Sequence, residues 1–264
     1  MIGKLIGKGD TADVFDIGNN KVVKLFKKDY PLNSVQNEFE NSNLLNELEI
    51  NIAKSYKLVK CRGRHGIIYD RINGISMMDL LLETKDFGKY AVDLALLHKI
   101  ILSHKLESAV SLKSILKNNI ENTDKLSMKC KSKLIVILDT LPDGNCFCHG
   151  DYHFGNILVN QEAYYIIDYM NVCRGHKYGD IARTVYLIGM TPTPSEIQNH
   201  DIERFLYMKE QIINIYLKEM GVDRECLLDW LMITAAARLS ELDDVQTDEI
   251  NSILEYLSVC KLDV

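Results

Sequence analysis

The sequence has little proline, no long apolar run and no Cys-x-x-Cys pair. Only 4 of its 264 residues are Pro, and its 7 Cys include no Cys-x-x-Cys spacing. The first ten residues lack the apolar stretch of a secretory signal peptide, and no apolar run approaches the length of a membrane span. We therefore expect reduced thiols and a cytoplasmic protein that does not insert into a membrane.

The sequence also lacks an excess of basic residues. It contains 31 Lys and Arg against 37 Asp and Glu, which gives a formal net charge of −6. Non-specific binding to nucleic acids or to anionic membrane surfaces requires a basic face, so neither is an expected partner. A hydrophobic fraction of 47% and a charged fraction of 26% are ordinary for a globular protein with a full core.

The first part of the chain is predicted to be rich in β-strands. Short runs of Val, Ile, Leu and Phe alternate with turn residues such as Gly18-Asn19-Asn20, which is typical of antiparallel strands joined by tight turns. A helix is expected from Ser34 to about Glu49, with Ser34 as its N-cap after Pro31. The expected strands are Lys4–Ile6, Asp13–Ile17, Lys21–Phe26, Ser55–Cys61 and Gly66–Asp70.

The rest of the chain is predicted to be mainly helical, because apolar residues recur there at helical spacing. Two short strands, Ile157–Val159 and Tyr164–Ile167, interrupt the helices, and Gly221 suits the position just after a helix end. The expected helices are Phe87–Leu102, Leu112–Asn122, Lys129–Thr140, Ile202–Met220 and Arg224–Leu239. A β-rich part followed by a helical part predicts an α+β fold.

The strongest functional signal is a set of polar residues around the two short strands. Asp151 and Asn156 precede the first strand, and Asp168 follows the second after a turn at Asn160-Gln161-Glu162. A hairpin of these strands would bring Asn156 and Asp168 together at its open end. Phosphoryl transfer requires oxygen ligands for Mg²⁺ and a separate carboxylate that receives the proton of the acceptor. The three residues supply these parts.

The segment His149-Gly150-Asp151 with Asn156 resembles the catalytic loop of the aminoglycoside phosphotransferase and choline kinase superfamily. The resemblance implies that Asp151 is the catalytic base and that Asn156 and Asp168 bind Mg²⁺. It also implies that His149 braces the loop through hydrogen bonds to the backbone.

That superfamily has the protein-kinase-like fold with two lobes. The resemblance implies a nucleotide-binding N-lobe of about residues 1–72 and a C-lobe of about residues 73–264, which carries the catalytic loop and acceptor-binding helices. Protein kinases typically have Arg and Lys where this chain has Gly150 and His153. The difference favours a small-molecule acceptor over a protein.

The resemblance extends upstream to a loop and a lysine. Gly7 and Gly9 lie between two expected strands, where small residues let backbone N–H groups approach phosphates. Lys24 lies in an apolar strand and needs an anionic partner. The kinase pattern supplies the α- and β-phosphates of the nucleotide and a Glu on the first helix. Glu38 is favoured as that Glu, and Glu40 is the alternative.

The segment Ile67–Gly74 resembles the hinge between kinase lobes. By analogy, the C=O of Asp70 and the N–H of Ile72 bind the edge of the purine base. Because the backbone reads the base, the side chains do not distinguish ATP from GTP. Asp180 matches an Asp that supports the catalytic loop in the family.

The resulting prediction is an Mg²⁺-dependent enzyme that moves the γ-phosphate of ATP or GTP to a hydroxyl group. The acceptor would be a small molecule such as an aminoglycoside, choline, ethanolamine or a sugar. Two other readings remain open. An atypical protein kinase would use the same residues on a protein, and a pseudokinase would bind nucleotide without chemistry. The sequence does not indicate the oligomeric state.

Three further residues have open roles. Arg174 and His176 follow Asp168 closely, so they either face the acceptor or a phosphate, or lie in a solvated loop. Trp230 could help to form an aromatic cage for a quaternary ammonium group. A helical core position is the favoured reading for Trp230.

Overall fold

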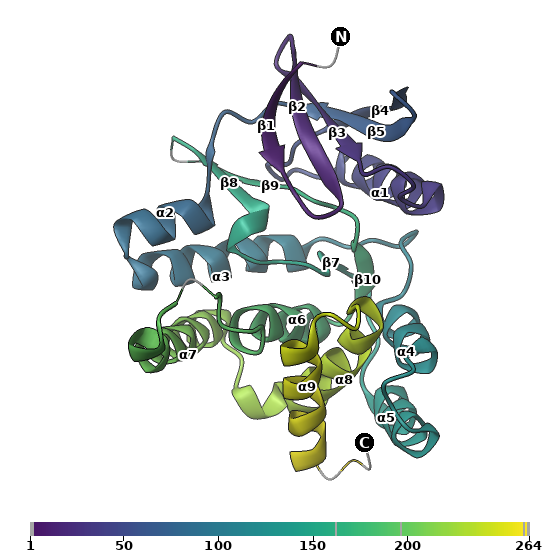
Figure 1. The fold of residues 1–264 in the computed structure, drawn as a ribbon, viewed down its shortest axis with the longest axis vertical. Helices are drawn as coiled ribbons and strands as arrows, with labels where there is room; N and C mark the ends of the chain where they lie inside the picture. The colour runs from purple at the N-terminus through teal and green to yellow at the C-terminus, as the bar shows by residue number, and fades with distance from the viewer. Residues whose placement is uncertain (1–2, 162, 196, 261, 263–264) are drawn as a thin grey trace. The chain divides into compact units, whose positions relative to one another are not determined.

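The computed structural model describes residues 3–161, 163–195, 197–260 and 262 (Figure 1). Among these residues, no helix combines the length and the apolar character that crossing a membrane requires.

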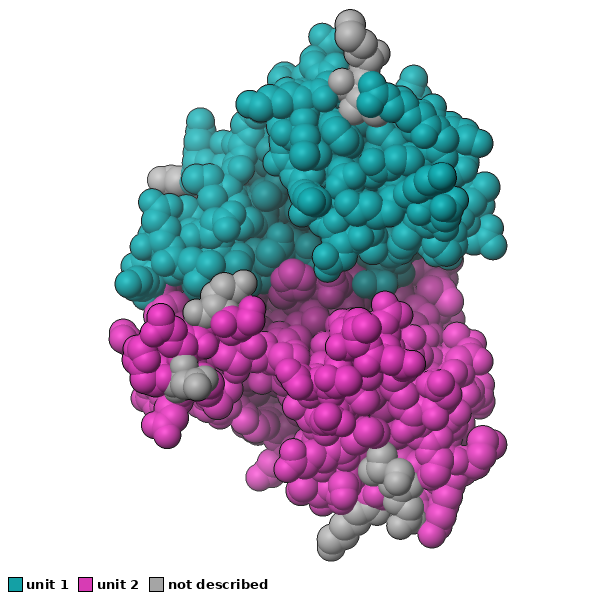
Figure 2. All heavy atoms as spheres, viewed as in Figure 1, with its two compact units in different colours: residues 1–85, 154–172 teal, residues 86–153, 173–264 magenta. Residues whose placement is uncertain are grey.

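The chain divides into two compact units (Figure 2). Unit 1 contains residues 1–85 and 154–172, and unit 2 contains residues 86–153 and 173–264. Unit 1 is mainly β-sheet and unit 2 is mainly helical, so the predicted α+β fold class is confirmed.

The observed division differs from the boundary expected after residue 72. Residues 73–85 and 154–172 belong to unit 1 because their strands pair with one another and with earlier residues. Strand β6 (Ile75–Ser76) pairs with β8, and Ile52 forms a parallel bridge to Ile166. The hairpin that follows the predicted catalytic loop is therefore part of unit 1.

The main sheet of unit 1 has five antiparallel strands in the order β1-β2-β3-β5-β4. Its predicted strands are confirmed, with ends that shift by up to two residues. Gly18, Asn19 and Asn20 all have positive φ values in the turn that joins the second and third strands. Gly and Asn adopt this conformation at little cost. The strands are β1 (Lys4–Lys8), β2 (Ala12–Gly18), β3 (Lys21–Phe26), β4 (Ser55–Cys61) and β5 (Arg64–Asp70).

Helix α1 (Leu32–Leu45) packs on this sheet and begins earlier than predicted. The prediction of Ser34 as N-cap was wrong. Pro31 occupies that position, and its C=O accepts hydrogen bonds from the N–H groups of Ser34 and Val35. A proline at a helix start loses no hydrogen bond, because the first N–H groups of a helix have no partner within it. The helix also ends four residues before Glu49.

The second sheet of unit 1 has the strand order β6-β8-β9. Strands β8 (Ile157–Asn160) and β9 (Ala163–Ile166) form the predicted hairpin, although Glu162 of its turn lies outside the described residues. A 3₁₀ turn (Phe154–Asn156) precedes β8, and helix α2 (Met77–Thr84) follows β6. The N–H of Ile167 donates a hydrogen bond to the C=O of Asn156 at 3.0 Å. The hairpin thus places Asn156, just before β8, next to Ile167, just after β9.

Unit 2 consists of helices around a two-stranded sheet, β7 (Cys146–Cys148) with β10 (Cys173–Gly175). All five predicted helices are confirmed, although the last begins at Leu228 rather than at Arg224, and α9 was not predicted. Gly221 ends α7 with a positive φ of 68°. The helices are α3 (Phe87–Ser103), α4 (Leu112–Asn122), α5 (Met128–Thr140), α6 (Lys177–Gly189), α7 (Ile202–Met220), α8 (Leu228–Arg238) and α9 (Thr247–Val259), with 3₁₀ turns at Asn199–Asp201, Arg224–Leu227 and Leu239–Glu241.

Candidate active site

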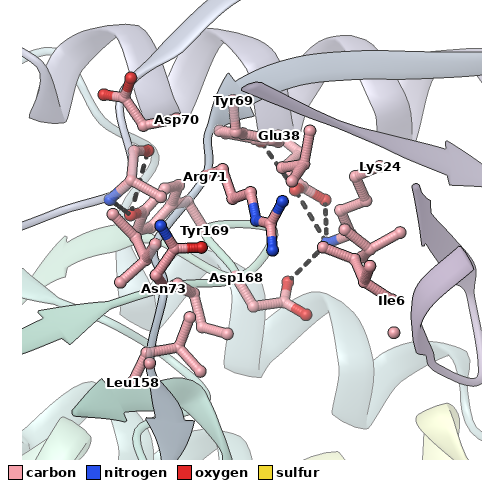
Figure 3. Close-up of a pocket in the computed structure, with 17 residues that line it drawn as sticks. Ile6, Lys24, Glu38, Tyr69, Asp70, Arg71, Asn73, Leu158, Asp168 and Tyr169 are labelled. Carbon is pink, nitrogen blue, oxygen red and sulfur yellow. Dashed lines mark hydrogen bonds and ion pairs between the residues drawn. The ribbon is translucent and has the colours of Figure 1, made fainter. Parts of the chain in front are cut away.

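Unit 1 contains a pocket of about 400 Å³ (Figure 3). Its walls are largely apolar and come from both sheets of the unit, while carboxylates and a lysine gather at one side of it. A pocket of this size with few polar groups is typical of a small-molecule site. The apolar lining includes Ile6, Val14, Val22, Ala53, Leu158 and Ile167.

Lys24 binds the two carboxylates on the polar side of this pocket, those of Glu38 and Asp168. Its Nζ lies 2.8 and 2.9 Å from the two carboxylate oxygens of Glu38 and 3.0 Å from Oδ1 of Asp168. Glu38 is fully buried, whereas Glu40, the alternative partner, is exposed. Burial alone would lower the pKa of Lys24, but the charges of Glu38 and Asp168 outweigh it and raise this pKa above its ordinary value. Lys24 is therefore a fixed cation.

Tyr69 is a pocket residue that the sequence did not single out. It lies on β5, and its buried hydroxyl donates a hydrogen bond of 2.9 Å to Oε1 of Glu38. Figure 3 shows Tyr69 and Lys24 approaching Glu38 from different strands. The carboxylate of Glu38 thus accepts three hydrogen bonds from two residues. Alternation along β5, which turns Ile67 and Tyr69 to the same face, was the available signal.

The segment expected to form the hinge lines the opposite side of the pocket. Asp70 and Ile72 both belong to the lining. The carboxylate of Asp70 binds Nζ of Lys21 at 2.7 Å and the hydroxyl of Tyr56 at 2.9 Å, so that side chain has partners of its own. Within the described part of the chain, the N–H of Ile72 donates no hydrogen bond, which leaves it available to a ligand.

Arg71 also contributes to this side, although the sequence did not mark it. Its backbone N–H donates to the C=O of Asn20 at 2.9 Å, and its guanidinium forms an ion pair with Asp16 on β2. Figure 3 shows the guanidinium directed into the pocket. Arg71 adds a second cation to a site that is otherwise largely apolar.

The two glycines of the first loop differ in position. Gly7 lies in β1 opposite Val14 and lines the pocket, and a Cβ there would approach Val14 to 3.4 Å. Gly9 lies in the turn, where its N–H donates to the C=O of Ala12 at 2.9 Å. Among the residues that line the pocket, Gly7 is present and Gly9 is not.

Asn156 and Asp168 flank the β8–β9 hairpin, as the sequence predicts. Asn156 is nearly buried, and the side chain of Asp168 is 37% exposed. Asp168 has a positive φ of 67°, a conformation that costs energy for residues other than Gly and is common at functional sites. Both residues offer oxygen atoms, the donors that Mg²⁺ prefers. Among the described residues, no group of three or more His, Cys, Asp and Glu side chains could hold a metal by itself.

The loop that is predicted to be catalytic, residues 149–153 in unit 2, is held by Asp180 in the first turn of α6. The carboxylate of Asp180 is fully buried and accepts hydrogen bonds from the backbone N–H groups of His149 at 2.7 Å and Gly150 at 2.8 Å. Nε2 of His98 lies 3.0 Å away, and its Nδ1 lies 2.6 Å from the hydroxyl of Tyr216. Burial alone would raise the pKa of Asp180, but His98 and the backbone donors outweigh it and lower this pKa.

His98 was missed because it occupies one position of an apolar helix, α3. A lone histidine among leucines does not indicate a partner that lies 82 residues away in the sequence. With the bonds described above, it fixes the backbone just before Asp151. Gly150 has a positive φ of 76° at this turn, which a residue with a Cβ adopts rarely.

Asp151 lies beside two histidines. Nε2 of His153 lies 3.6 Å from Oδ2 of Asp151. The backbone N–H of Asp151 donates a hydrogen bond to Nδ1 of the buried His149 at 3.3 Å. Burial alone would raise the pKa of Asp151. The interaction with His153 and the charge of Arg183 outweigh burial and hold this pKa well below its ordinary value. Asp151 is therefore ionised at neutral pH, as a general base requires.

The residues with open roles have structural partners. Trp230 is 1% exposed and packs in the core of unit 2, which agrees with the favoured reading. His176 precedes α6, where its Nδ1 accepts a hydrogen bond from the N–H of Tyr178, and its ring stacks on Trp230. The N–H of Arg174 on β10 donates to the C=O of Val110.

A comparison with protein families tests the family resemblance that the sequence indicates. The sequence model of the phosphotransferase enzyme family matches residues 3–209, which is most of the chain. The chain belongs to this family. As a phosphotransferase, it is an enzyme of the small-molecule kinase type, and the predicted resemblance is confirmed. The matched residues include the pocket of unit 1 and the loop around Asp151. No curated protein sequence matches the chain.

Solved structures with a similar fold are also phosphotransferases. An amicoumacin kinase in complex with AMP-PNP, Ca²⁺ and Ami has a TM-score of 0.61 at 14% identity, over 96% of this chain and 87% of that chain. An aminoglycoside-3'-phosphotransferase of type VIII has a TM-score of 0.58 at 16% identity, over 91% and 92%. A choline/ethanolamine kinase family protein from Mesorhizobium loti has a TM-score of 0.58 at 11% identity, over 97% and 87%. At these identities the likeness confirms the predicted protein-kinase-like fold.

Proposed function

We propose that this phosphotransferase moves the γ-phosphate of ATP or GTP to a hydroxyl group of a small-molecule acceptor, with Mg²⁺. The observation that carries the proposal is the ionic cluster of Lys24, Glu38 and Asp168 beside an apolar pocket. An apolar pocket suits a purine base, and a fixed cation suits its phosphates. The AMP-PNP bound in the amicoumacin kinase supports a nucleotide in this fold.

Unit 1 residues would bind the nucleotide. The C=O of Asp70 and the N–H of Ile72 read the edge of the base, and Lys24 binds the α- and β-phosphates while Glu38 holds it in place. Gly7 and Gly9 let the first loop approach the phosphates, because neither carries a side chain. The nucleotide-binding lobe would be about residues 1–72, joined in unit 1 by residues 73–85 and 154–172, and the other residues of 73–264 would carry the catalytic loop and the acceptor-binding helices.

Asn156 and Asp168 would hold Mg²⁺, since both present hard oxygen donors and lie at the same end of one hairpin. When bound, Mg²⁺ neutralises charge on the transferred phosphoryl group. Protein carboxylates usually supply only one or two of its ligands, and phosphate oxygens and waters supply the others. A donor set of one carboxylate and one amide fits this chemistry.

Asp151 would orient the acceptor hydroxyl and receive its proton. Its lowered pKa keeps it ionised, and His149 fixes the backbone around it. A base that contributes in this way accounts for about a 10²–10⁴-fold rate effect. The acceptor class remains open among aminoglycosides, choline, ethanolamine, sugars and related metabolites.

The test is a coupled nucleotide-consumption assay with Mg²⁺, run with ATP and with GTP against aminoglycosides, choline, ethanolamine, amino sugars and nucleosides. We expect one acceptor class to support turnover and Asp151→Asn to abolish it. Asp124→Asn, which changes an exposed carboxylate of the same unit, should have no effect. Turnover on protein substrates alone would favour an atypical protein kinase. Nucleotide binding without any transfer would favour a pseudokinase.

A further inference from the structure

The catalytic loop of unit 2 has a second support besides Asp180. Nε of Arg183 donates a hydrogen bond of 3.2 Å to the C=O of Gly150, the residue just before Asp151. Arg183 lies on α6, one helical turn beyond Asp180. The two side chains hold different groups of the loop, because Asp180 accepts from its N–H groups and Arg183 donates to a carbonyl.

Arg183 is itself held by a carboxylate from far along the chain. Its second guanidinium nitrogen lies 2.8 Å from Oε2 of Glu241, and its side chain is only 12% exposed. Glu241 also binds Arg238 at 2.8 Å. With two of its three nitrogens engaged, the guanidinium has a fixed plane, which a lysine could not reproduce.

The support continues to the last helix of the chain. Nε of Arg238 binds Oε1 of the buried Glu249 at 2.9 Å, and the hydroxyl of Tyr186 donates to the same oxygen at 2.7 Å. Arg238, Glu241 and Glu249 come from α8, the 3₁₀ turn after it and α9, and Figure 1 shows α8 and α9 packed in the region of α6. The family match ends at residue 209, so these three residues lie outside it.

We propose that Arg183, held by Glu241, is a positioning residue for the catalytic base, and that the segment 238–249 outside the family match sets the position of the catalytic loop. The proposal rests on the proposed role of Asp151. Arg183 acts through the backbone of Gly150, so its loss should impair the chemical step and leave nucleotide binding in unit 1 intact. Because Glu241 fixes the plane of the Arg183 guanidinium, removal of the Glu241 carboxylate should impair the chemical step in the same way but to a smaller extent.

The experiment compares Arg183→Gln, Arg183→Lys and Glu241→Gln with wild type. Arg224→Gln is the matched control, because Arg224 forms an exposed ion pair with Glu210 on the same unit. The first measurement is hydrogen–deuterium exchange of the peptide that contains residues 149–153, which requires no substrate. The second is kcat and the nucleotide KM in the coupled assay, with the acceptor that the panel identifies or with water as acceptor in nucleotide hydrolysis. Asp151→Asn runs beside them.

We expect Arg183→Gln to raise exchange in the 149–153 peptide and to lower kcat by at least tenfold with an unchanged nucleotide KM. Arg183→Lys and Glu241→Gln should show smaller changes in both exchange and kcat than Arg183→Gln. Arg224→Gln should match wild type in both measurements. Unchanged exchange in Arg183→Gln and Glu241→Gln would overturn the proposal, as would a fall in kcat that Arg224→Gln shares. If Asp151→Asn keeps full turnover, the assignment of Asp151 as the base is wrong. If Asp151→Asn loses turnover and Arg183→Gln does not, only the positioning role of Arg183 is contradicted.

Discussion

Lys24 and Glu38 form an ion pair in which the ammonium nitrogen of Lys24 contacts both oxygens of the buried Glu38 carboxylate, at 2.8 and 2.9 Å. Taking two charges out of water is costly, and mutual attraction with good geometry offsets this cost. Removal of one partner leaves the other buried and uncompensated. The pair is therefore a sensitive point for both folding and nucleotide binding.

Replacing Lys24 by Met should weaken nucleotide binding and destabilise the fold. The change leaves Glu38 buried without its cation, which typically costs about 3–5 kcal/mol. Urea unfolding measures the stability, and a nucleotide titration measures the affinity. Lys27→Met is the matched control, since it removes a more exposed ion pair with Asp13 and should lower the unfolding free energy less. An equal decrease in unfolding free energy in the two variants would show that the burial of Lys24 is unimportant.

Replacing Tyr69 by Phe should loosen Glu38 without emptying the pocket. The lost hydroxyl donates to a buried carboxylate, and such hydrogen bonds contribute about 1.5–3 kcal/mol. We expect a lower unfolding free energy and a higher nucleotide KM. Tyr56→Phe removes a more exposed hydroxyl that binds Asp70, so it serves as the control. A Tyr69→Phe enzyme with wild-type stability and KM would refute this role.

The pH profile should reflect the environment of Asp151. A base acts when ionised, and the lowered pKa of Asp151 places its loss of activity at a pH below the ordinary carboxyl range. His153→Gln removes the nearest favourable group, so the pKa should rise and the acid limb of kcat/KM should move to higher pH. His200→Gln changes an exposed histidine and should leave the limb in place. Movement to lower pH in His153→Gln would contradict the sign of this effect.

Asp180→Asn should destabilise unit 2 more than a surface substitution does. The amide keeps one acceptor but loses the charge that pairs with His98 and the two backbone N–H groups, a loss of about 3–5 kcal/mol for a buried partner. Urea unfolding measures this difference. Asp229→Asn, in the exposed first turn of α8, should cost about 0.3–1 kcal/mol. A similar cost for both would show that the buried network adds little.

Much of unit 1 could be predicted because its signals are local. Turn residues such as Gly18-Asn19-Asn20 separate short apolar runs, and an isolated Lys24 in an apolar strand requires an anionic partner. The start of α1 was misplaced because Ser34 is a good N-cap by residue type, whereas Pro31, which has no N–H to donate and is tolerated at a helix start, occupies that position.

Asp180 was predicted to support the catalytic loop, but the contributions of His98 and Arg183 could not be predicted, because their contacts form between distant parts of the chain. His98 meets Asp180 across 82 residues, and Arg183 meets Glu241 across 58 residues. Each is an ordinary residue within its own helix, and helical periodicity indicates which face is buried but not which helix it meets. Only tertiary packing brings these charges together.

The most direct test of the central claim is transfer of the γ-phosphate by wild type and by Asp151→Asn, measured with Mg²⁺ against the acceptor panel. We predict that wild type phosphorylates one class of small molecule, and that Asp151→Asn binds nucleotide with unchanged affinity but transfers phosphate at least about 10²-fold more slowly. Near-normal transfer by Asp151→Asn, or failure of wild type to bind either nucleotide, would contradict it.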